Sequence, residues 1–177
     1  LAGSVPCGVD TDIYKRIIEM VHKKGAKVLL DADGELFTNA VTAKPDIIKP
    51  NRIELEQYAG MDYIASEQEL FRMAKSLVED GIETVVVSMG KSGALFLQGD
   101  YQVKCPGLKV KAHSTVGAGD AMVAALSYAW DKKMTAKETV TLCMAVSAGA
   151  VTTIGTKPPT REMVDDLMEQ VVIEELK

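Results

Sequence analysis

The chain has 177 residues, of which 47% are hydrophobic and 25% charged, and its formal net charge is −5. This length and composition fit one compact globular domain with a sizeable core. Because the basic residues are spread along the chain and never more than two stand together, we expect neither nucleic acid nor a membrane as a partner, and any anionic ligand requires a local site. We also expect no bilayer-spanning stretch and no signal peptide. Three widely spaced cysteines indicate reduced thiols and a cytoplasmic location.

The first half of the chain alternates between helical and strand patterns. Helices are predicted from a cap at Asp10 or Thr11 to Gly25, over 35–43, from Asn51 to Tyr58 and from Ser66 to Glu79. Short apolar strands are predicted over 27–30, 46–48 and 83–88. This alternation with short connections predicts an α/β fold with a mostly parallel sheet covered by helices. His22 falls on a lysine-rich helix face, where we expect it to be solvated.

The pattern changes after Gly93. Three short strands are predicted over 94–97, 101–105 and 108–112, and they read as an antiparallel edge of the sheet. Helices are then predicted over 117–130, 136–151 and 160–172. We see no repeat and no linker, so a single domain over residues 1–177 is expected.

The most specific segment is Ser114-Thr115-Val116-Gly117-Ala118-Gly119-Asp120, which opens a long helix. Glycines at a helix start let the backbone approach a ligand, and the free amides there form an anion site together with the helix dipole. A carboxylate beside such a site suits a base that deprotonates a hydroxyl while the amides stabilise a transferring phosphoryl group. The same residues also suit a glycine-rich turn whose aspartate only stabilises the helix.

Two other glycine-rich phosphate motifs do not match. A dinucleotide fingerprint would need a third glycine where Met122 stands, and a P-loop ending in Gly90-Lys91-Ser92 would need its first glycine where Val85 stands.

The whole run from Ser114 to Ser127 resembles the second signature of the PfkB family of carbohydrate kinases, which have a ribokinase-like, three-layer α/β/α fold. The resemblance implies that Asp120 is the catalytic base and contacts the acceptor. It also implies that the amides of Gly117, Ala118 and Gly119 form the anion hole for the phosphoryl group.

Lys49-Pro50-Asn51-Arg52-Ile53-Glu54 is the second segment with such a likeness. Asn-x-x-Glu at a helix start is close to a capping box, in which the glutamate reaches back to the cap amide. It also resembles the N-x-x-E motif of the family, which implies that Asn51 and Glu54 order Mg²⁺ through water near the ATP phosphates. On the same resemblance Lys49 reaches the nucleotide. Capping and metal organisation can coexist.

Three further segments match the family less specifically. Ser88-Met89-Gly90-Lys91-Ser92-Gly93 suits a tight turn, and it is similar to the family's loop along ATP, which implies nucleotide contacts for Ser88, Gly90 and Gly93. By position in the family only, Met144 and Ser147 lie near an apolar adenine pocket. The stretch from Ala2 to Val9 suits a Pro/Gly loop and also resembles the G-S-x-P-x-G-V stretch of kinases acting on sugar phosphates, which places Ser4 near the acceptor.

The resemblance covers essentially the whole chain but only the later part of the family fold. We therefore expect the C-terminal ATP-binding and catalytic part of one kinase domain, inactive as a fragment, whose N-terminal part is missing. The implied reaction is ATP- and Mg²⁺-dependent phosphorylation of a hexose phosphate, of the 1-phosphofructokinase or tagatose-6-phosphate kinase type. A homodimer is expected for the full-length protein. The alternatives are a ribokinase- or nucleoside-kinase-type activity on an unphosphorylated acceptor, and a non-catalytic nucleotide-binding module.

Overall fold

The computed structural model describes residues 1–176, and the chain divides into two compact units. Unit 1 consists of Leu1–Ser88 with Leu97–Asp100, and unit 2 consists of Met89–Phe96 with the chain from Tyr101 onward. Strand β4 (Ala94–Gln98) contributes residues to both units. The strands follow the order β1-β2-β3-β4-β5-β6. Over the described residues, no helix combines the length and the apolar character that crossing a membrane would need.

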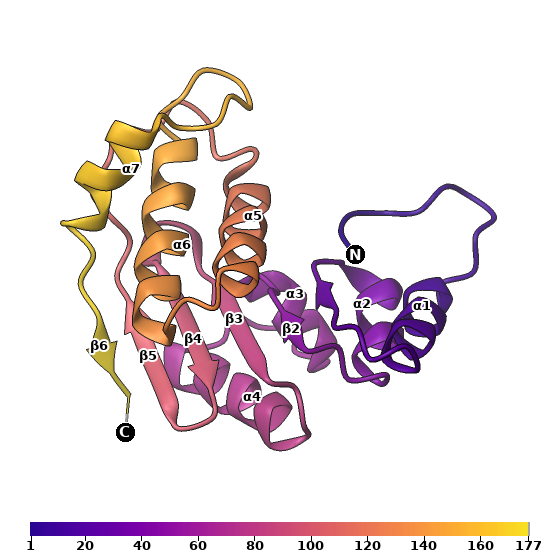
Figure 1. The fold of residues 1–177 in the computed structure, drawn as a ribbon. Coiled ribbons are helices and arrows are strands. Elements are labelled where there is room, and N and C mark those ends of the chain that lie inside the picture. Colours follow the sequence, from indigo (N-terminus) through magenta and orange to yellow (C-terminus); the bar gives the residue numbers. More distant parts are fainter. Residues whose placement is uncertain (177) are drawn as a thin grey trace. The chain divides into compact units, whose positions relative to one another are not determined.

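Unit 1 alternates helices with parallel strands, as the sequence predicts (Figure 1). Leu29 and Leu30 pair in parallel with Ile47 and Ile48, which pair in parallel with the start of the next strand. Because both faces of these strands are covered, their residues form near-continuous apolar runs and are buried. The elements of this unit are α1 (Ile13–His22), β1 (Leu29–Leu30), α2 (Gly34–Val41), β2 (Ile47–Ile48), α3 (Arg52–Tyr58), α4 (Glu67–Glu79) and β3 (Thr84–Ser88).

Local sequence explains where these helices begin. Ser66 caps α4 as predicted, since its hydroxyl accepts from the amide of Glu69 while the Glu69 carboxylate accepts from the amide of Ser66. The predicted cap of α1 at Asp10 or Thr11 is one or two residues early. In the structure Asp12 is the N-cap and its side chain makes no capping hydrogen bond.

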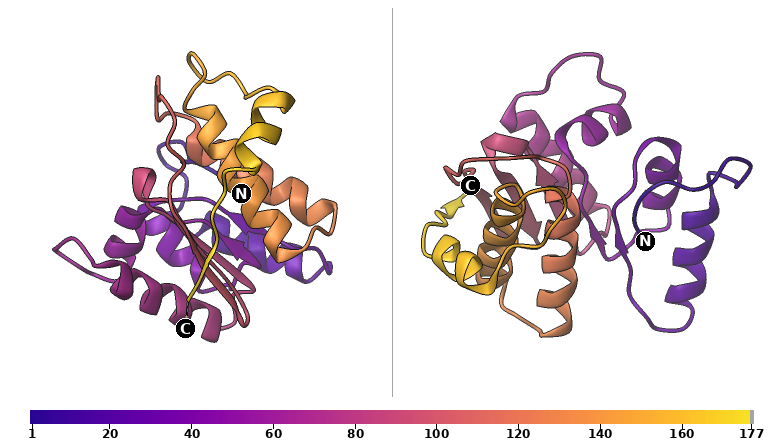
Figure 2. Two further views of the ribbon diagram at one scale, coloured as in Figure 1. Left: turned by 90° about the vertical axis from the view of Figure 1, so that its left-hand side faces the viewer. Right: turned by 90° about the horizontal axis from the view of Figure 1, so that it is seen from above.

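Unit 2 is a group of helices on an antiparallel pair of strands. Helix α6 packs against α5, α7 and strand β5, and Figures 1 and 2 show α6 and α7 side by side. The antiparallel edge that the sequence predicts is confirmed, because β5 pairs antiparallel with β6. The elements of this unit are the 3₁₀ turn η1 (Gly90–Ser92), β5 (Tyr101–Cys105), α5 (Ala118–Asp131), α6 (Ala136–Ala150), α7 (Arg161–Met168) and β6 (Glu174–Glu175).

The predicted strand over 108–112 is wrong. Val110 instead donates to the carbonyl of Leu108 in a local turn, and the partner of β5 is β6, through Val103 opposite Glu175. Pro106 ends β5 because proline has no amide for a ladder. The last helix also ends earlier than predicted, at Met168, and the chain after it turns toward β5.

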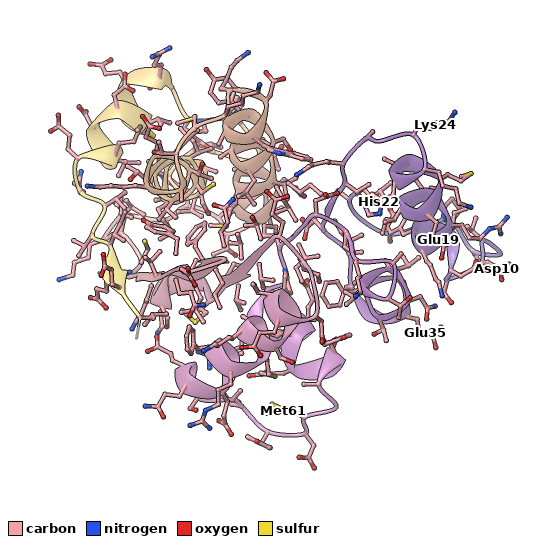
Figure 3. All side chains as sticks on the ribbon, turned by 60° about the horizontal axis from the view of Figure 1, so that its bottom comes forward. Asp10, Glu19, His22, Lys24, Glu35 and Met61 are labelled. Carbon is pink, nitrogen blue, oxygen red and sulfur yellow. The ribbon has the colours of Figure 1, made fainter. Side chains whose placement is uncertain are left out.

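The prediction that His22 is solvated is also wrong. Its Nε2 lies 3.0 Å from Oδ2 of Asp46, which also accepts from the amide of Val28 at 2.8 Å. His22 is the last residue of α1, and Figure 3 shows it with Glu19 of the same helix and Lys24 of the following turn. The His22 ring therefore joins α1 to Asp46, the residue that precedes β2. The two residues are 24 positions apart, so helical spacing does not reveal their pairing.

Candidate active site

The start of α5 is built as an open helix N-terminus. Gly117 is the N-cap with φ +86°, a left-handed conformation that glycine adopts without strain. Because glycine has no side chain, no capping hydrogen bond forms from this residue to the amides of the first turn. The amide of Ala118 donates to the Thr115 carbonyl over a long 3.4 Å. Within residues 1–176 the amides of Gly117, Gly119 and Asp120 donate to no protein group. These amides therefore remain available to an anion.

Asp120 lies in the first turn of this helix and is exposed. Its carboxylate makes no hydrogen bond or ion pair with any residue that the structure describes. A carboxylate in this position keeps its lone pairs free for a proton, while nearby amides offer positive partial charge. Open amide donors and an unengaged carboxylate thus occur on one helical turn.

Asn51 and Glu54 form the capping box that opens α3. The amide of Asn51 donates to Oε2 of Glu54 at 2.8 Å, and the amide of Glu54 donates to Oδ1 of Asn51 at 3.0 Å. The side-chain amide of Asn51 also donates to Oε1 of Glu54. Asn51 pairs with Ser88 in a parallel bridge, and the Ser88 amide donates to the carbonyl of Pro50 at 3.0 Å. The N-x-x-E motif therefore lies at the carboxyl end of β3.

The charge around Glu54 is predominantly negative. Burial raises the pKa of its carboxyl above the ordinary value, and the charges of Asp31 and Asp33 act in the same direction. The hydrogen bond from Asn51 and the charge of Lys49 oppose this rise. Among the described residues, no three histidine, cysteine or acidic side chains converge as direct metal ligands.

Lys49, which the resemblance brings to the nucleotide, has a protein partner in the structure. Its side chain is buried, and Nζ lies 3.0 Å from Oδ1 of Asp31, the residue directly after β1. A buried ammonium is stable only when a partner compensates its lost hydration, and Asp31 supplies that partner. Nothing in the sequence spacing links these two strand ends, which lie 18 positions apart, so the sequence does not predict this pairing.

The turn between β3 and β4 is shaped by two glycines. Gly90 has φ +56° and Gly93 has φ +99°. The carbonyl of Gly93 accepts from the Met89 amide at 2.8 Å, which closes the turn. Gly93 also lies so close to Cys105 that a Cβ there would stand 1.8 Å from its carbonyl oxygen. Close packing of the backbone is therefore enough to require a glycine at position 93, whether or not a ligand also approaches it.

The remaining predicted residues are distributed over both units. Ser4 is exposed in unit 1, where the preceding Ala2 forms a parallel bridge with Asp31. Met144 is buried in α6 of unit 2. Ser147, also in α6, donates its hydroxyl to the Ala118 carbonyl at 3.2 Å. The structure thus groups the residues of the N-x-x-E motif with Ser88 in unit 1, and the α5 amides with Asp120 and Ser147 in unit 2.

The family model described as "pfkB family carbohydrate kinase" matches residues 1–163. The chain belongs to this family. The 1-phosphofructokinase of Haemophilus influenzae is 36% identical over 174 residues, which cover 98% of this chain and 55% of that relative. The D-tagatose-1-phosphate kinase of Bacillus licheniformis is 35% identical over 124 residues, which cover 70% of this chain and 41% of the relative.

A solved structure of phosphofructokinase-2 from Escherichia coli, in complex with potassium, has the same fold. Its TM-score is 0.89 at 27% identity, over 96% of this chain and 55% of that one. The expected ribokinase-like α/β architecture of a pfkB kinase is thereby confirmed. The chain spans about half the length of the relatives that it matches.

Proposed function

We propose that the protein transfers the γ-phosphoryl group of ATP to a hydroxyl of a hexose phosphate. The start of α5 carries this proposal, because unengaged amides and an unengaged carboxylate share its first turn. Relatives named 1-phosphofructokinase and D-tagatose-1-phosphate kinase support the acceptor class. Both names describe kinases that act on a ketohexose already phosphorylated at carbon 1.

Asp120 is the proposed base. Its carboxylate takes the proton of the acceptor hydroxyl as the acceptor oxygen bonds to the γ-phosphorus, and the bond from that phosphorus to ADP breaks. The open amides of Gly117 and Gly119, with that of Ala118, bind the charge on the equatorial oxygens of the moving group. These donors are fixed in place before the reaction, so they stabilise the transition state without reorganising.

The other predicted residues serve the nucleotide and its metal. In this proposal the Ser88–Gly93 turn lies along the ATP phosphates and ribose, while Met144 and Ser147 contribute to the adenine side. Ser4 is proposed to contact the acceptor. Lys49 serves the nucleotide side indirectly, because its ammonium compensates Asp31 and lowers the pKa of Glu54.

Asn51 and Glu54 fit a magnesium ion that is bound through water. Every oxygen of the pair already accepts a hydrogen bond within the capping box, but each retains a lone pair for a metal-bound water. Mg²⁺ keeps several waters and takes few protein ligands, which agrees with this donor set. When bound, the ion would supply positive charge to the ATP phosphates.

The decisive test is Asp120→Asn in the full-length protein. The amide is nearly isosteric but cannot accept the hydroxyl proton, so we expect turnover to fall about 10²- to 10⁴-fold with ATP affinity nearly unchanged. Steady-state kinetics and calorimetric ATP titration measure the two quantities. Glu162→Gln is the matched control, since Glu162 is an exposed acid in the first turn of α7. Near-normal turnover of Asp120→Asn would refute the role of the carboxylate.

A further inference from the structure

Ser147 links the middle of unit 2 to the anion hole. Its hydroxyl on α6 donates to the carbonyl of Ala118, the first residue of α5, at 3.2 Å. A serine hydroxyl has one proton, so this bond leaves Ser147 able only to accept from a ligand. The bond joins two helices through residues that are 29 positions apart in sequence. Its acceptor lies in the helical turn that carries the open amides.

The chain just after Ser147 also approaches the same loop at two further places. At the end of α6, the carbonyl of Val151 accepts from the His113 amide at 2.7 Å, immediately before the Ser114–Asp120 loop. Further on, the methyl carbon of Thr156 lies 3.8 Å from where a Cβ on Gly117 would stand. Residues 147–156, which we call the brace, therefore form hydrogen bonds with the chain on both sides of the left-handed glycine.

The brace and helix α6, from which it continues, are well packed. Helix α6 starts with a complete capping box at Thr135, and its buried face includes Cys143 and Met144. After the helix, the Thr153 hydroxyl is close to the carbonyls of both Ala150 and Lys157, which holds the return turn together. Close packing of Gly149 against Pro159 leaves no room for a Cβ at that glycine. A well-packed support of this kind can hold a flexible glycine loop in one geometry.

We propose that Ser147 is a positioning residue, which fixes the first turn of α5 so that its open amides keep the orientation that phosphoryl transfer requires. This inference rests on the proposed function and assigns Ser147 a role through Ala118 in addition to any contact with ATP. The Ala118 carbonyl also accepts a backbone hydrogen bond within α5, so it still has a partner when the Ser147 bond is lost. We therefore expect Ser147→Ala to loosen the turn with little loss of overall stability.

The test compares Ser147→Ala with Ser147→Thr and Thr141→Val in the full-length protein. Thr141 is also on α6, but its hydroxyl bonds to the Lys137 carbonyl of the same helix. For Ser147→Ala we expect hydrogen exchange at the Ala121 and Met122 amides to quicken at least threefold, and kcat to fall roughly three- to tenfold. KM for the sugar phosphate should stay within about twofold. Ser147→Thr keeps the hydroxyl and should restore both, and Thr141→Val should change neither.

Unchanged exchange at Ala121 and Met122 in Ser147→Ala would overturn the inference, whatever the kinetics. The same holds if Thr141→Val quickens that exchange equally. Should Ser147→Ala fail to fold, Ser147→Cys replaces it, because a thiol fills the site but donates weakly. The exchange measurement needs no turnover, so a wild-type protein without kinase activity would refute the proposed function while the exchange result still decides the role of Ser147.

Discussion

Gly93 shows how one residue can be fixed by packing and by backbone conformation together. With φ +99° it lies where side chains are strained, and a Cβ would meet the Cys105 carbonyl at 1.8 Å. We expect Gly93→Ala to lower the free energy of unfolding by about 3 kcal/mol or more, because the Cys105 carbonyl belongs to the backbone and cannot move aside as a side chain could. Urea unfolding followed by circular dichroism measures this change.

Gly60→Ala is the control for that substitution. Gly60 has φ +68°, but no heavy atom lies within 4 Å of its hypothetical Cβ. Its alanine variant should lose only the cost of the left-handed conformation, about 1 kcal/mol. Equal losses in the two variants would show that backbone strain alone fixes Gly93, and that the contact with Cys105 contributes nothing.

At the same scale, the sequence predicts the open amides and the acid at the start of α5 because their signal is local. Glycine, helix start and acid lie within a few residues, and elementary electrostatics links them. The sequence does not predict the pairing of Lys49 with Asp31 or of Ser147 with Ala118. Each of these contacts depends on which strand ends or helix ends are neighbours in the fold. The residue spacing of a single sequence does not reveal those neighbours.

Among the elements, α4 carries a prediction about pH. The amide and hydroxyl of Ser66 donate to the Glu69 carboxylate, as does the Tyr63 hydroxyl, and these bonds hold the pKa of Glu69 below its ordinary value of 4.5. An acid with a lowered pKa stabilises the fold when ionised, so this contribution is present above about pH 4.5 and lost as pH falls through the folded-state value.

Glu69→Gln isolates that contribution. The difference in free energy of unfolding between wild type and variant should be largest near neutral pH and shrink below about pH 4.5, where the unfolded carboxyl takes up its proton. Denaturant unfolding at a series of pH values measures it. Glu162→Gln, an exposed acid in the first turn of α7, serves as the control. If the difference in free energy of unfolding stayed constant from pH 7 to pH 3, the ionised Glu69 carboxylate would not be what stabilises this helix start.

The elements that sequence predicted well have strong local signals. Helix α4 has a capping serine at its start and Gly81 after its end, and β3 is a run of β-branched residues. The failures lie where pairing is decided over long distances. Residues 108–112 alternate like a strand, but the edge of β5 is taken by Glu174–Glu175, a pair of exposed acids with low β-propensity. Strand propensity therefore pointed to the wrong partner.

For the whole molecule, the remaining prediction concerns which sugar phosphate accepts the phosphoryl group. Two relatives that match over nearly the whole chain are named 1-phosphofructokinase, and the tagatose kinase is also named for a 1-phosphate. A ketohexose 1-phosphate carries its phosphate at the end of the sugar remote from the 6-hydroxyl, so a site built for it must bind that phosphate away from the base. The net charge of −5 on this chain offers no general attraction for such an anion, so discrimination must come from local contacts.

We therefore expect the full-length protein to phosphorylate fructose 1-phosphate with a kcat/KM at least tenfold above that for fructose 6-phosphate or tagatose 6-phosphate. A site arranged to pair with one phosphate position leaves its polar groups unpaired with the other isomer, which costs well over a tenfold factor. Coupled ADP-release assays with the three sugar phosphates, ribose and adenosine side by side measure these ratios. Activity confined to ribose or adenosine would replace the hexose phosphate by an unphosphorylated acceptor, and ATP binding without transfer to any of them would remove the catalytic assignment of Asp120.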